Sequence, residues 1–392
     1  MNVGVDARCL MSRELTGVGQ YTRNLLDAVF KIDKTNQYYL FYNSLQNVLQ
    51  NIPQWDQDNI HYVYTRWPNK LLNLLLWLKL IKLDHLIIKN CLKIKNSKLK
   101  INIWFSPNLN FTHLSLHFKH IQTIHDLSFE FLPWCFTLKQ RLWHWFLNPR
   151  KQCQKAEIIL TPSENTRRDV CEVYKVETHC NASVPKVIKL MPGVSSDFGL
   201  RTTDYGTKVK EKYFLYLGTL EPRKNVEAVI EAYKELRYKI QDTPRHELGS
   251  NARYKLVIAG GKGWKNKKLL KLIQETSGVK YSVYVGETEK QVLYSQASLF
   301  VFPSLYEGFG LPVLEAMAAG VPVITSNRSS LPEVVGEAGY LVNPRNVAEI
   351  AEAMNVILKN QELRIKIIER QKERVKMFSW QKSAEEFVKL LV

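Results

Sequence analysis

Short apolar segments alternate with amphipathic ones along most of the chain. In the first half, the apolar runs each end in a polar or proline-containing turn: VGVDA, YYLFY, IWFSP, IQTIHD and EIILTPS. The second half repeats the arrangement with YFLYLG (213–218), KLVIAGG (255–261), SVYVG (282–286), LFVFPS (299–304) and VPVITS (321–326). Helical periodicity appears between them, at about 21–30, after Ser163 and over 225–236. Strands separated by helices predict an α/β fold with parallel, doubly wound sheets.

A polar stretch divides the chain into two halves. Residues 193–212 are rich in Ser, Thr, Asp and Gly and lack helical periodicity, so we place a domain junction there. The predicted domains are 1–200 and 201–376, and a last helix over about 377–392 is expected to pack back onto the first domain. Two α/β halves of similar size predict a ligand cleft between them.

Composition narrows the class of protein. Hydrophobic residues make up 45% and charged residues 23%, which excludes a disordered, collagenous or membrane-spanning chain. The first residues, MNVGVD, show no signal peptide, so we predict a cytoplasmic protein. The six cysteines lack C-x-x-C spacing and are expected to be buried free thiols. The formal charge of +18 predicts an anionic partner.

The most informative segment is PSLYEGFGLPVLEAMAAGVPVITS, residues 303–326. A strand is followed by a glycine-rich turn, Pro312 suits the first position of a helix, and Gly320 suits its end. Backbone N–H groups converge at such a helix N-terminus and can bind phosphate. Gly308 and Gly310 would let the backbone approach a ligand closely.

Two carboxylates flank this predicted phosphate site. Glu307 and Glu315 are eight residues apart, one in the turn and one in the helix. A carboxylate repels phosphate, so we expect both to contact sugar or ribose hydroxyls. The alternative is that Glu307 only complements the helix dipole and that Glu315 is a solvated helix residue.

Two cations follow the strand YFLYLG. Arg223 and Lys224 lie next to a helix start at the carboxyl end of that strand, within TLEPRKN. Such cations can neutralise a leaving diphosphate, Arg through a bidentate fork and Lys as a point charge. Solvated surface charge is the alternative.

Several motifs together resemble a known family. GTLEPRKN, AGGKGW, FVFPSLYEGFGLPVLEAMAAGVPVITS and SSLPEVVGEAGYLVNP are similar to retaining glycosyltransferases of family 4, which are also called group 1. VGVDARCL, TGVGQYTRNLL and TIHDLSF resemble the N-terminal domain of that family. The subgroup it resembles contains bacterial mannosyltransferases that build O-antigen and other surface polysaccharides.

The resemblance implies a GT-B fold, with two facing Rossmann-like domains, and no metal requirement. The second domain would bind the nucleotide-sugar and the first the acceptor. Glu307 would contact donor-sugar hydroxyls and Glu315 the ribose, while Arg223 and Lys224 would stabilise the leaving diphosphate. The backbone amides of Phe309, Gly310 and Leu311 would reach the diphosphate, and Gly308, Gly218 and Thr219 would also contribute to the donor site.

Two further assignments come from the first domain. His125 would lie near the reacting sugar, and the turn Gly17–Val18–Gly19 would border phosphates or acceptor. His125 has a structural alternative, since a His that ends a strand beside Asp126 can simply be hydrogen-bonded there. Many family members have Arg where this chain has Thr219, so Arg223 and Lys224 would supply both cations.

Residues 70–100 form a basic amphipathic segment with eight Lys and one Asp. Treated as one helix at ~100° per residue, Lys79, Lys82, Lys89 and Lys93 fall on one stripe. A second cluster places aromatic residues among cations: Trp134, Phe136, Trp143, Trp145 and Phe146 with Lys139, Arg141, Arg150 and Lys151. Both clusters favour contact with an anionic membrane surface; a core helix with a wet Lys face is the alternative.

The leading hypothesis is therefore a metal-independent retaining glycosyltransferase on the inner face of the plasma membrane. It would move a hexose from a nucleoside-diphosphate sugar, with GDP-mannose as the first choice, to a lipid-linked or polysaccharide acceptor. No cofactor is expected. A basic nucleic-acid-binding protein is the alternative, but the charge is spread evenly over both halves and no nucleic-acid module occurs.

Overall fold

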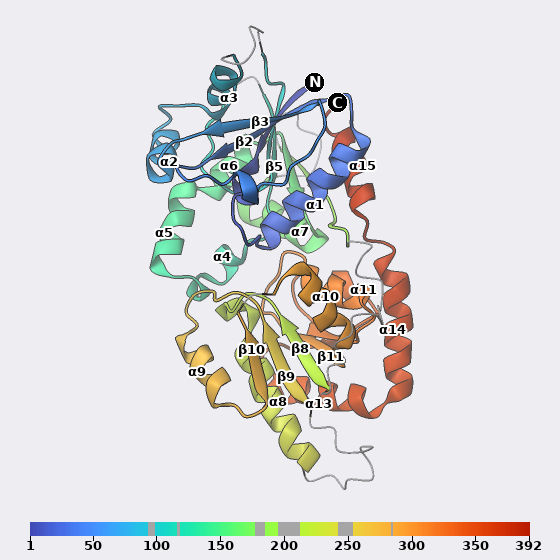
Figure 1. The fold of residues 1–392 in the computed structure, drawn as a ribbon. Coiled ribbons are helices and arrows are strands. Elements are labelled where there is room, and N and C mark those ends of the chain that lie inside the picture. Colours follow the sequence, from blue (N-terminus) through green and yellow to red (C-terminus); the bar gives the residue numbers. More distant parts are fainter. Residues whose placement is uncertain (93–98, 116–117, 177–184, 195–211, 242–253, 284) are drawn as a thin grey trace. The chain divides into compact units, whose positions relative to one another are not determined.

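The computed structural model describes residues 1–92, 99–115, 118–176, 185–194, 212–241, 254–283 and 285–392 (Figure 1). The chain forms two compact units. Unit 1 comprises residues 1–127, 139–193 and 379–392, and unit 2 comprises residues 128–138 and 194–378. Both are helix-covered parallel sheets, which confirms the predicted α/β fold.

Unit 1 contains a sheet with the strand order β3-β2-β1-β4-β5-β6-β7. Every pairing is parallel, and the central strands bury Val5, Phe105 and Ile121 completely. The strands are β1 (Asn2–Asp6), β2 (Gln37–Asn43), β3 (Ile60–Thr65), β4 (Ile103–Ser106), β5 (Lys119–Thr123), β6 (Ile158–Thr161) and β7 (Lys186–Lys189).

The helices of unit 1 include α7, whose start follows from its sequence. The Ser163 side chain accepts a hydrogen bond from the Thr166 backbone N–H and so caps the helix. The helices are α1 (Gly17–Ile32), α2 (Asn69–Trp77), α3 (Leu83–Leu92), α5 (Leu138–Leu147, whose first residue is assigned to unit 2), α6 (Pro149–Lys155), α7 (Glu164–Tyr174) and α15 (Trp380–Lys389).

Unit 2 contains a parallel sheet with the order β10-β9-β8-β11-β12-β13. Its strands are β8 (Tyr213–Leu217), β9 (Lys255–Ala259), β10 (Val279–Ser282), β11 (Leu299–Phe302), β12 (Val323–Ser326) and β13 (Tyr340–Val342). Its helices are α4 (Ser128–Phe131), α8 (Val226–Gln241), α9 (Lys267–Glu275), α10 (Glu287–Gln296), α11 (Leu311–Ala318), α12 (Leu331–Val335), α13 (Val347–Lys359) and α14 (Gln361–Val375).

Residues 128–138 belong to unit 2 and residues 379–392 belong to unit 1, although each segment is far in sequence from most of its unit. In unit 2, the Trp264 indole N–H donates to the Cys135 carbonyl at 2.7 Å, and Lys265 Nζ donates to the Trp134 carbonyl at 2.6 Å. In unit 1, α15 packs on α1 and β4, with the Phe387 ring 4.6 Å from that of Phe105. The chain therefore passes between the units more than once.

The structure corrects three local predictions. Residues 17–19 are the first turn of α1, not a turn before it. The strand predicted over 282–286 lies earlier, at β10, and Gly286 caps α10. The single helix assumed over residues 71–93 is broken, because Leu78 ends α2 and Lys79 adopts a left-handed φ of 59°.

Other expectations lie partly outside the described residues. Most of the junction 193–212, Lys93 and Cys180 are in this group, as is the side chain of Cys91. Four cysteines are free thiols; Cys135 and Cys153 are buried, but Cys9 and Cys171 are partly exposed. Within the described residues, no helix has the length and apolarity to cross a bilayer.

Candidate active site

The candidate site lies at the point where the strand order of the unit 2 sheet reverses. Strands β8 and β11 are neighbours, and their following connections run in opposite directions along the sheet. Ligands of doubly wound sheets bind at the carboxyl ends of strands at such a point. The loops that leave these two strands, residues 218–225 and 303–310, carry Arg223, Lys224 and Glu307.

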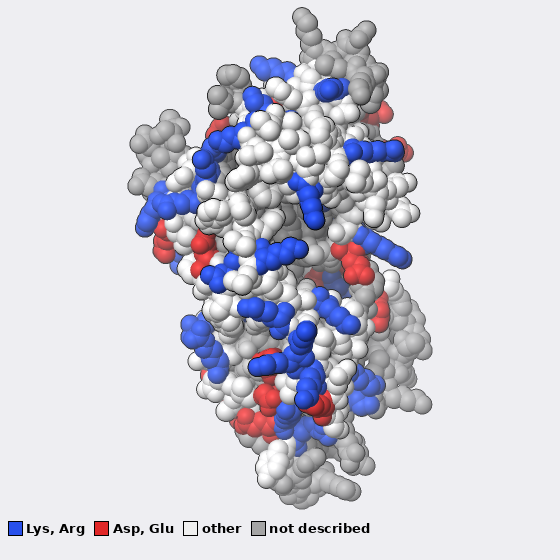
Figure 2. All heavy atoms as spheres, turned by 90° about the vertical axis from the view of Figure 1, so that its left-hand side faces the viewer, with Lys and Arg blue, Asp and Glu red and all other residues white. Residues whose placement is uncertain are grey.

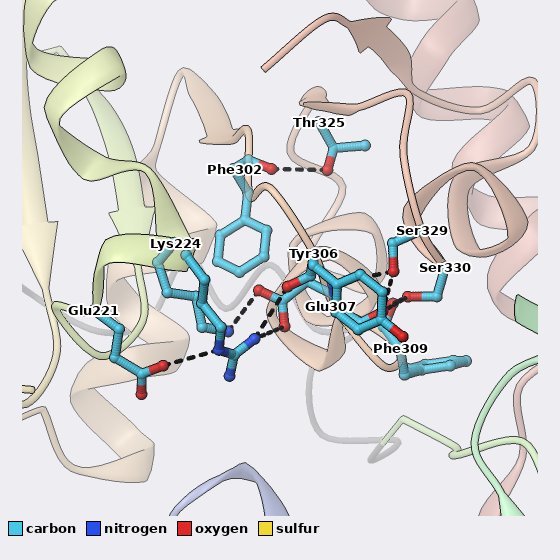
Figure 3. A network of polar contacts seen from close by, with 10 residues as sticks. Glu221, Lys224, Phe302, Tyr306, Glu307, Phe309, Thr325, Ser329 and Ser330 are labelled. Atoms are coloured by element: carbon cyan, nitrogen blue, oxygen red, sulfur yellow. Dashed lines mark hydrogen bonds and ion pairs between the residues drawn. The ribbon is translucent and has the colours of Figure 1, made fainter. Parts of the chain in front are cut away.

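Three charged side chains meet there (Figure 3). Lys224 Nζ lies 2.6 Å from Glu307 Oε1, and Arg223 Nη1 lies 3.1 Å from Glu307 Oε2. Arg223 also donates through Nε to Glu221 at 2.9 Å. The structure thus brings together the residues predicted from two separate motifs, and the surface-charge alternative for the cations is wrong.

The ionisation of Glu307 is set by these neighbours. Only 5% of the residue is exposed, and burial by itself would raise the pKa of the carboxyl group. Lys224 and then Arg223 outweigh burial, so the pKa lies below its ordinary value. Glu307 is therefore a carboxylate at neutral pH. It accepts one hydrogen bond at each oxygen from these cations, which leaves lone pairs for ligand hydroxyls.

The two loops are fixed to one another. The Leu305 backbone N–H donates to the Arg223 carbonyl at 2.8 Å. Asn225, with a left-handed φ of 58°, donates through its amide to the Pro303 carbonyl at 3.0 Å and the Pro344 carbonyl at 2.6 Å. These bonds hold the cations and Glu307 in register without a ligand, which is the preorganisation that electrostatic catalysis requires.

Two serines hold the glycine-rich turn from the other side. Ser329 Oγ accepts from the Glu307 N–H at 3.2 Å and donates to its carbonyl at 2.5 Å. Ser330 Oγ donates to the Glu307 and Phe309 carbonyls at 2.9 Å each. Figure 3 shows both serines beside the turn. The Phe309–Gly310–Leu311 backbone therefore enters α11 in a fixed conformation.

Gly310 is required at the start of α11. It has a left-handed φ of 109°, and a Cβ atom there would lie 2.7 Å from Leu331 Cδ2. Pro312 is the second residue of α11, one place after the predicted first position, and the first N–H groups of a helix have no acceptor within it. In the other loop, Gly218 lies against the turn after β9, because a Cβ on Gly260 would lie 2.3 Å from the Gly218 carbonyl oxygen, and the Thr219 carbonyl accepts from the Glu221 N–H at 2.9 Å.

Glu315 lies on α11 in a second charged cluster. Lys290 Nζ donates to its Oε1 at 2.7 Å, and the Tyr294 hydroxyl donates to its Oε2 at 3.0 Å. Glu315 and Lys290 are only 9% and 5% exposed, so the alternative of a solvated helix residue is wrong. Burial raises the pKa of Glu315, against the opposing effect of Lys290. Burial opposes the charge of Lys290 too, but Glu315 and Glu287 raise its pKa, so it is a cation.

Tyr216 lies beneath the site. It is fully buried on β8, its ring stacks on Phe302 at 5.7 Å, and its hydroxyl makes no hydrogen bond within the described part of the chain. Burial, followed by the nearby Glu307 and Glu221, raises the pKa of this hydroxyl well above its ordinary value. It is therefore a neutral, buried donor close to the carboxylates.

The site residues predicted in unit 1 lie in the segment after β5 and at the start of helix α1. His125 follows β5 and lies edge-on to Tyr21, with ring centroids 4.9 Å apart. Its Nε2 donates to the Pro107 carbonyl at 2.7 Å, and burial lowers its pKa. It is a neutral imidazole with a backbone partner, as the structural alternative describes. Val18 and the glycines on either side of it form the start of α1, and Gly19 allows close packing on the Cys9 carbonyl.

Sequence reasoning missed the partners of the two glutamates. Ser329, Ser330, Lys290 and Tyr294 come from segments remote from Glu307 and Glu315, although the spacing of four between Lys290 and Tyr294 is a weak sign of a shared helix face. In the described residues, no three His, Cys, Asp or Glu side chains are grouped as metal ligands would be. Paired Asp residues in a D-x-D motif can hold a divalent ion. One such motif, Asp56 and Asp58, lies in unit 1 with both residues exposed.

Comparison with known proteins shows which protein family the chain resembles. Residues 202–374, most of unit 2, match the family described as "Glycosyl transferases group 1". The chain is 28% identical to O-antigen chain mannosyltransferase B of Escherichia coli over 94% of its own length and 93% of that protein. Unit 2 is thus similar to the group 1 glycosyltransferases, and the whole chain is similar to an O-antigen mannosyltransferase, so the nucleic-acid-binding alternative is not favoured.

Solved structures agree with the fold. Sucrose-phosphate synthase from Thermosynechococcus elongatus superposes with a TM-score of 0.72 at 18% identity, over 100% of this chain and 98% of that one. WaaG, a glycosyltransferase involved in lipopolysaccharide biosynthesis, superposes with a TM-score of 0.67 at 15% identity, over 100% and 99%. The fold is therefore GT-B, as the motifs predicted.

Proposed function

We propose that the chain is a retaining, metal-independent hexosyltransferase that uses a nucleoside-diphosphate sugar and extends a bacterial surface polysaccharide. The observation that carries the proposal is the ion-paired cluster of Arg223, Lys224 and Glu307 at the strand-order reversal. Mannose is the first choice of sugar, because relatives over most or part of the chain are called O-antigen mannosyltransferases.

The chemistry follows from charge. Breaking the bond between the sugar and the diphosphate leaves negative charge on phosphate, which Arg223 and Lys224 would stabilise. The guanidinium has five N–H donors and the ammonium three, so both can bind phosphate oxygens while each keeps its bond to Glu307. The N–H groups at the start of α11 would add fixed partial positive charge.

Glu307 is suited to bind hydroxyls and poorly suited to donate a proton. Its lowered pKa keeps it ionised, and two cations hold its oxygens. It would orient donor-sugar hydroxyls, and Glu315 would accept from the ribose with the lone pairs that Lys290 and Tyr294 leave.

Retention would then proceed from one face of the sugar. The acceptor oxygen bonds to the anomeric carbon as the bond to phosphate breaks, and the acceptor proton passes to a leaving phosphate oxygen. NMR spectroscopy of the first-formed product should show the anomeric configuration of the donor. An inverted product would contradict the mechanism.

The enzyme would act in the cytoplasm, at the inner face of the plasma membrane. Its acceptor would be a lipid-linked glycan or a growing polysaccharide. This rests on the resemblance to O-antigen enzymes, and unit 1 would bind it, with His125 and Gly17–Gly19 as candidate contacts. No nucleic acid is required at any step.

The decisive experiment is a donor panel. Purified protein is incubated with GDP-mannose and other nucleoside-diphosphate hexoses, and both donor hydrolysis and thermal stabilisation are measured. A true donor stabilises the native chain by mass action, and Glu307→Gln should retain the fold but lose turnover. If no nucleotide sugar is hydrolysed or stabilises the chain, the proposal fails.

A further inference from the structure

Two helices of unit 1 leave many large apolar side chains in contact with solvent. Trp145 is 72% exposed and Leu80 is 67% exposed. We refer to this surface as the apolar platform; its members are Leu71, Leu74, Trp77, Leu78, Leu80, Leu142, Trp143, Trp145 and Phe146. They come from two short stretches, residues 71–80 and 142–146, whereas apolar side chains are normally exposed singly.

The platform is one continuous surface. The Trp77 ring on α2 meets the Phe146 ring on α5 edge-on, with centroids 5.5 Å apart, and Phe146 meets Trp145 at 4.9 Å. Figure 1 shows α2 and α5 on the same side of unit 1. The other face of α2 is anchored, because Leu72 and Leu76 are buried in a core cluster. The exposed residues are therefore held in place by a packed helix.

The segments that form and adjoin the platform carry charge of one sign. Helices α2, α5 and α6 contain no Asp or Glu, and the turn after α2 adds only cations. The cations are Lys70, Lys79, Lys82, Lys139, Arg141, Arg150, Lys151 and Lys155. In the upper part of Figure 2, which faces this side of the molecule, uncharged surface lies among Lys and Arg, and Asp and Glu are seen toward the edges. Burial and then the nearby Lys79 and Lys151 lower the pKa of Lys155, so these cations repel one another.

We propose that the apolar platform and its surrounding cations dock unit 1 onto the surface of a lipid bilayer that carries anionic headgroups. Exposed Trp and Leu are suited to the boundary between headgroups and acyl chains, and cations beside them are suited to anionic lipid. The acid-free segments at the platform favour this partner over a protein surface of mixed charge.

This surface differs from the stripe predicted by sequence. Because α2 ends before Lys79, the four lysines of that stripe do not share one helix face. Lys89 lies on α3, and Lys93 is outside the described residues. The platform instead combines α2 and the turn after it with α5, which is more than sixty residues away in sequence, and α6 adds only cations beside it.

The test is co-sedimentation with vesicles of phosphatidylcholine alone or mixed with phosphatidylglycerol. The platform variant Leu80→Ser/Trp145→Ser is compared with the control Ile365→Ser/Tyr238→Ser, whose residues are exposed by 49% and 71% on unit 2. Because all four side chains are exposed, thermal melts should be unchanged. We expect the wild type and the control to bind anionic vesicles alike and the platform variant to bind at least about tenfold more weakly.

Charge is tested separately. Lys79→Gln/Lys82→Gln should weaken binding to anionic vesicles by about fivefold for each cation removed, and Lys89→Gln should weaken it less. Failure of the wild type to bind anionic vesicles overturns the proposal, as does equal binding by the platform variant. Self-association that the platform variant abolishes, without vesicle binding, would identify a second copy as the partner instead.

The assay contains no donor and no acceptor, so its outcome is independent of the proposed function. Donor hydrolysis in solution should be the same in the platform variant and the wild type. A chain that binds vesicles but hydrolyses no donor would refute only the proposed chemistry.

Discussion

Lys290→Met tests the buried charge pair on which the position of Glu315 depends. The substitution keeps a long apolar stem and removes the ammonium that lies 2.7 Å from Glu315 Oε1. Glu315 then keeps the Tyr294 hydroxyl, at 3.0 Å, as a hydrogen-bond donor. The result is a buried carboxylate without its cation.

The expected loss of stability is large. Removing one partner of a buried ion pair costs about 3–5 kcal/mol, because the remaining charge is desolvated and uncompensated. Glu287 also approaches Lys290, at 3.4 Å, but it is mostly exposed and contributes little. For a unit of this size the melting temperature should fall by about 6–20 °C.

The loss should also depend on pH, with a definite sign. Burial raises the pKa of Glu315 in the folded state, and Lys290 opposes the rise, so the pKa in Lys290→Met should be higher still. A carboxyl group whose pKa is raised by folding favours the folded state at low pH, and this contribution is lost as pH rises through the raised value. The variant should therefore be closest to wild type in acid.

Urea denaturation at about pH 5 and about pH 8, followed by circular dichroism, measures both effects. Lys290→Met/Glu315→Gln is the control, since it removes the buried charge and should regain most of the stability at the higher pH. A loss below about 1 kcal/mol, or an equal loss at both pH values, would refute the reasoning.

The remaining predictions concern the reaction and unit 1. Arg223→Ala should lower kcat by about 100-fold or more but change donor affinity less, because the cation matters most as charge develops; equal effects on both would contradict this. EDTA should leave transfer rates unchanged, and metal-dependent activity would count against the mechanism. Tyr216→Phe should not lower the free energy of unfolding, because the hydroxyl has no described hydrogen bond to lose. Burial lowers the pKa of His120 to about 4, so unit 1 should lose stability as pH falls below about 6.5, and His120→Gln should flatten that loss in urea titrations.

Hydrophobic patterning predicted the sheets well because most strands are continuous apolar runs between turns. It missed the short β7 and β13, whose sequences KVIK and YLV give little signal. It missed β3 as well, although IHYVYT is rich in the β-branched and aromatic residues that favour strands. It also treated residues 71–93 as one helix. Periodicity carries no information on tertiary contacts such as the Leu83 N–H bonded to the His113 carbonyl at 2.9 Å.

The charged cluster at Glu307 was predictable for a topological reason. Its residues directly follow two strands, and polar residues after adjacent parallel strands converge at one sheet edge. The partners of Glu315 were not predictable in this way, because Lys290 and Tyr294 lie on a helix that precedes the strand. Their proximity depends on how α10 packs against α11, which no local pattern encodes.

The inclusion of residues 128–138 in unit 2 bears on how this protein can be dissected. Tyr306, whose carbonyl accepts from Arg223, packs its ring 5.5 Å from that of Phe131. A fragment expressed from residue 194 onward would lack this ring and the carbonyls that bind Trp264 and Lys265. Separate production of unit 2 therefore calls for grafting residues 128–138 onto it, since plain truncation would remove the contacts to Tyr306, Trp264 and Lys265.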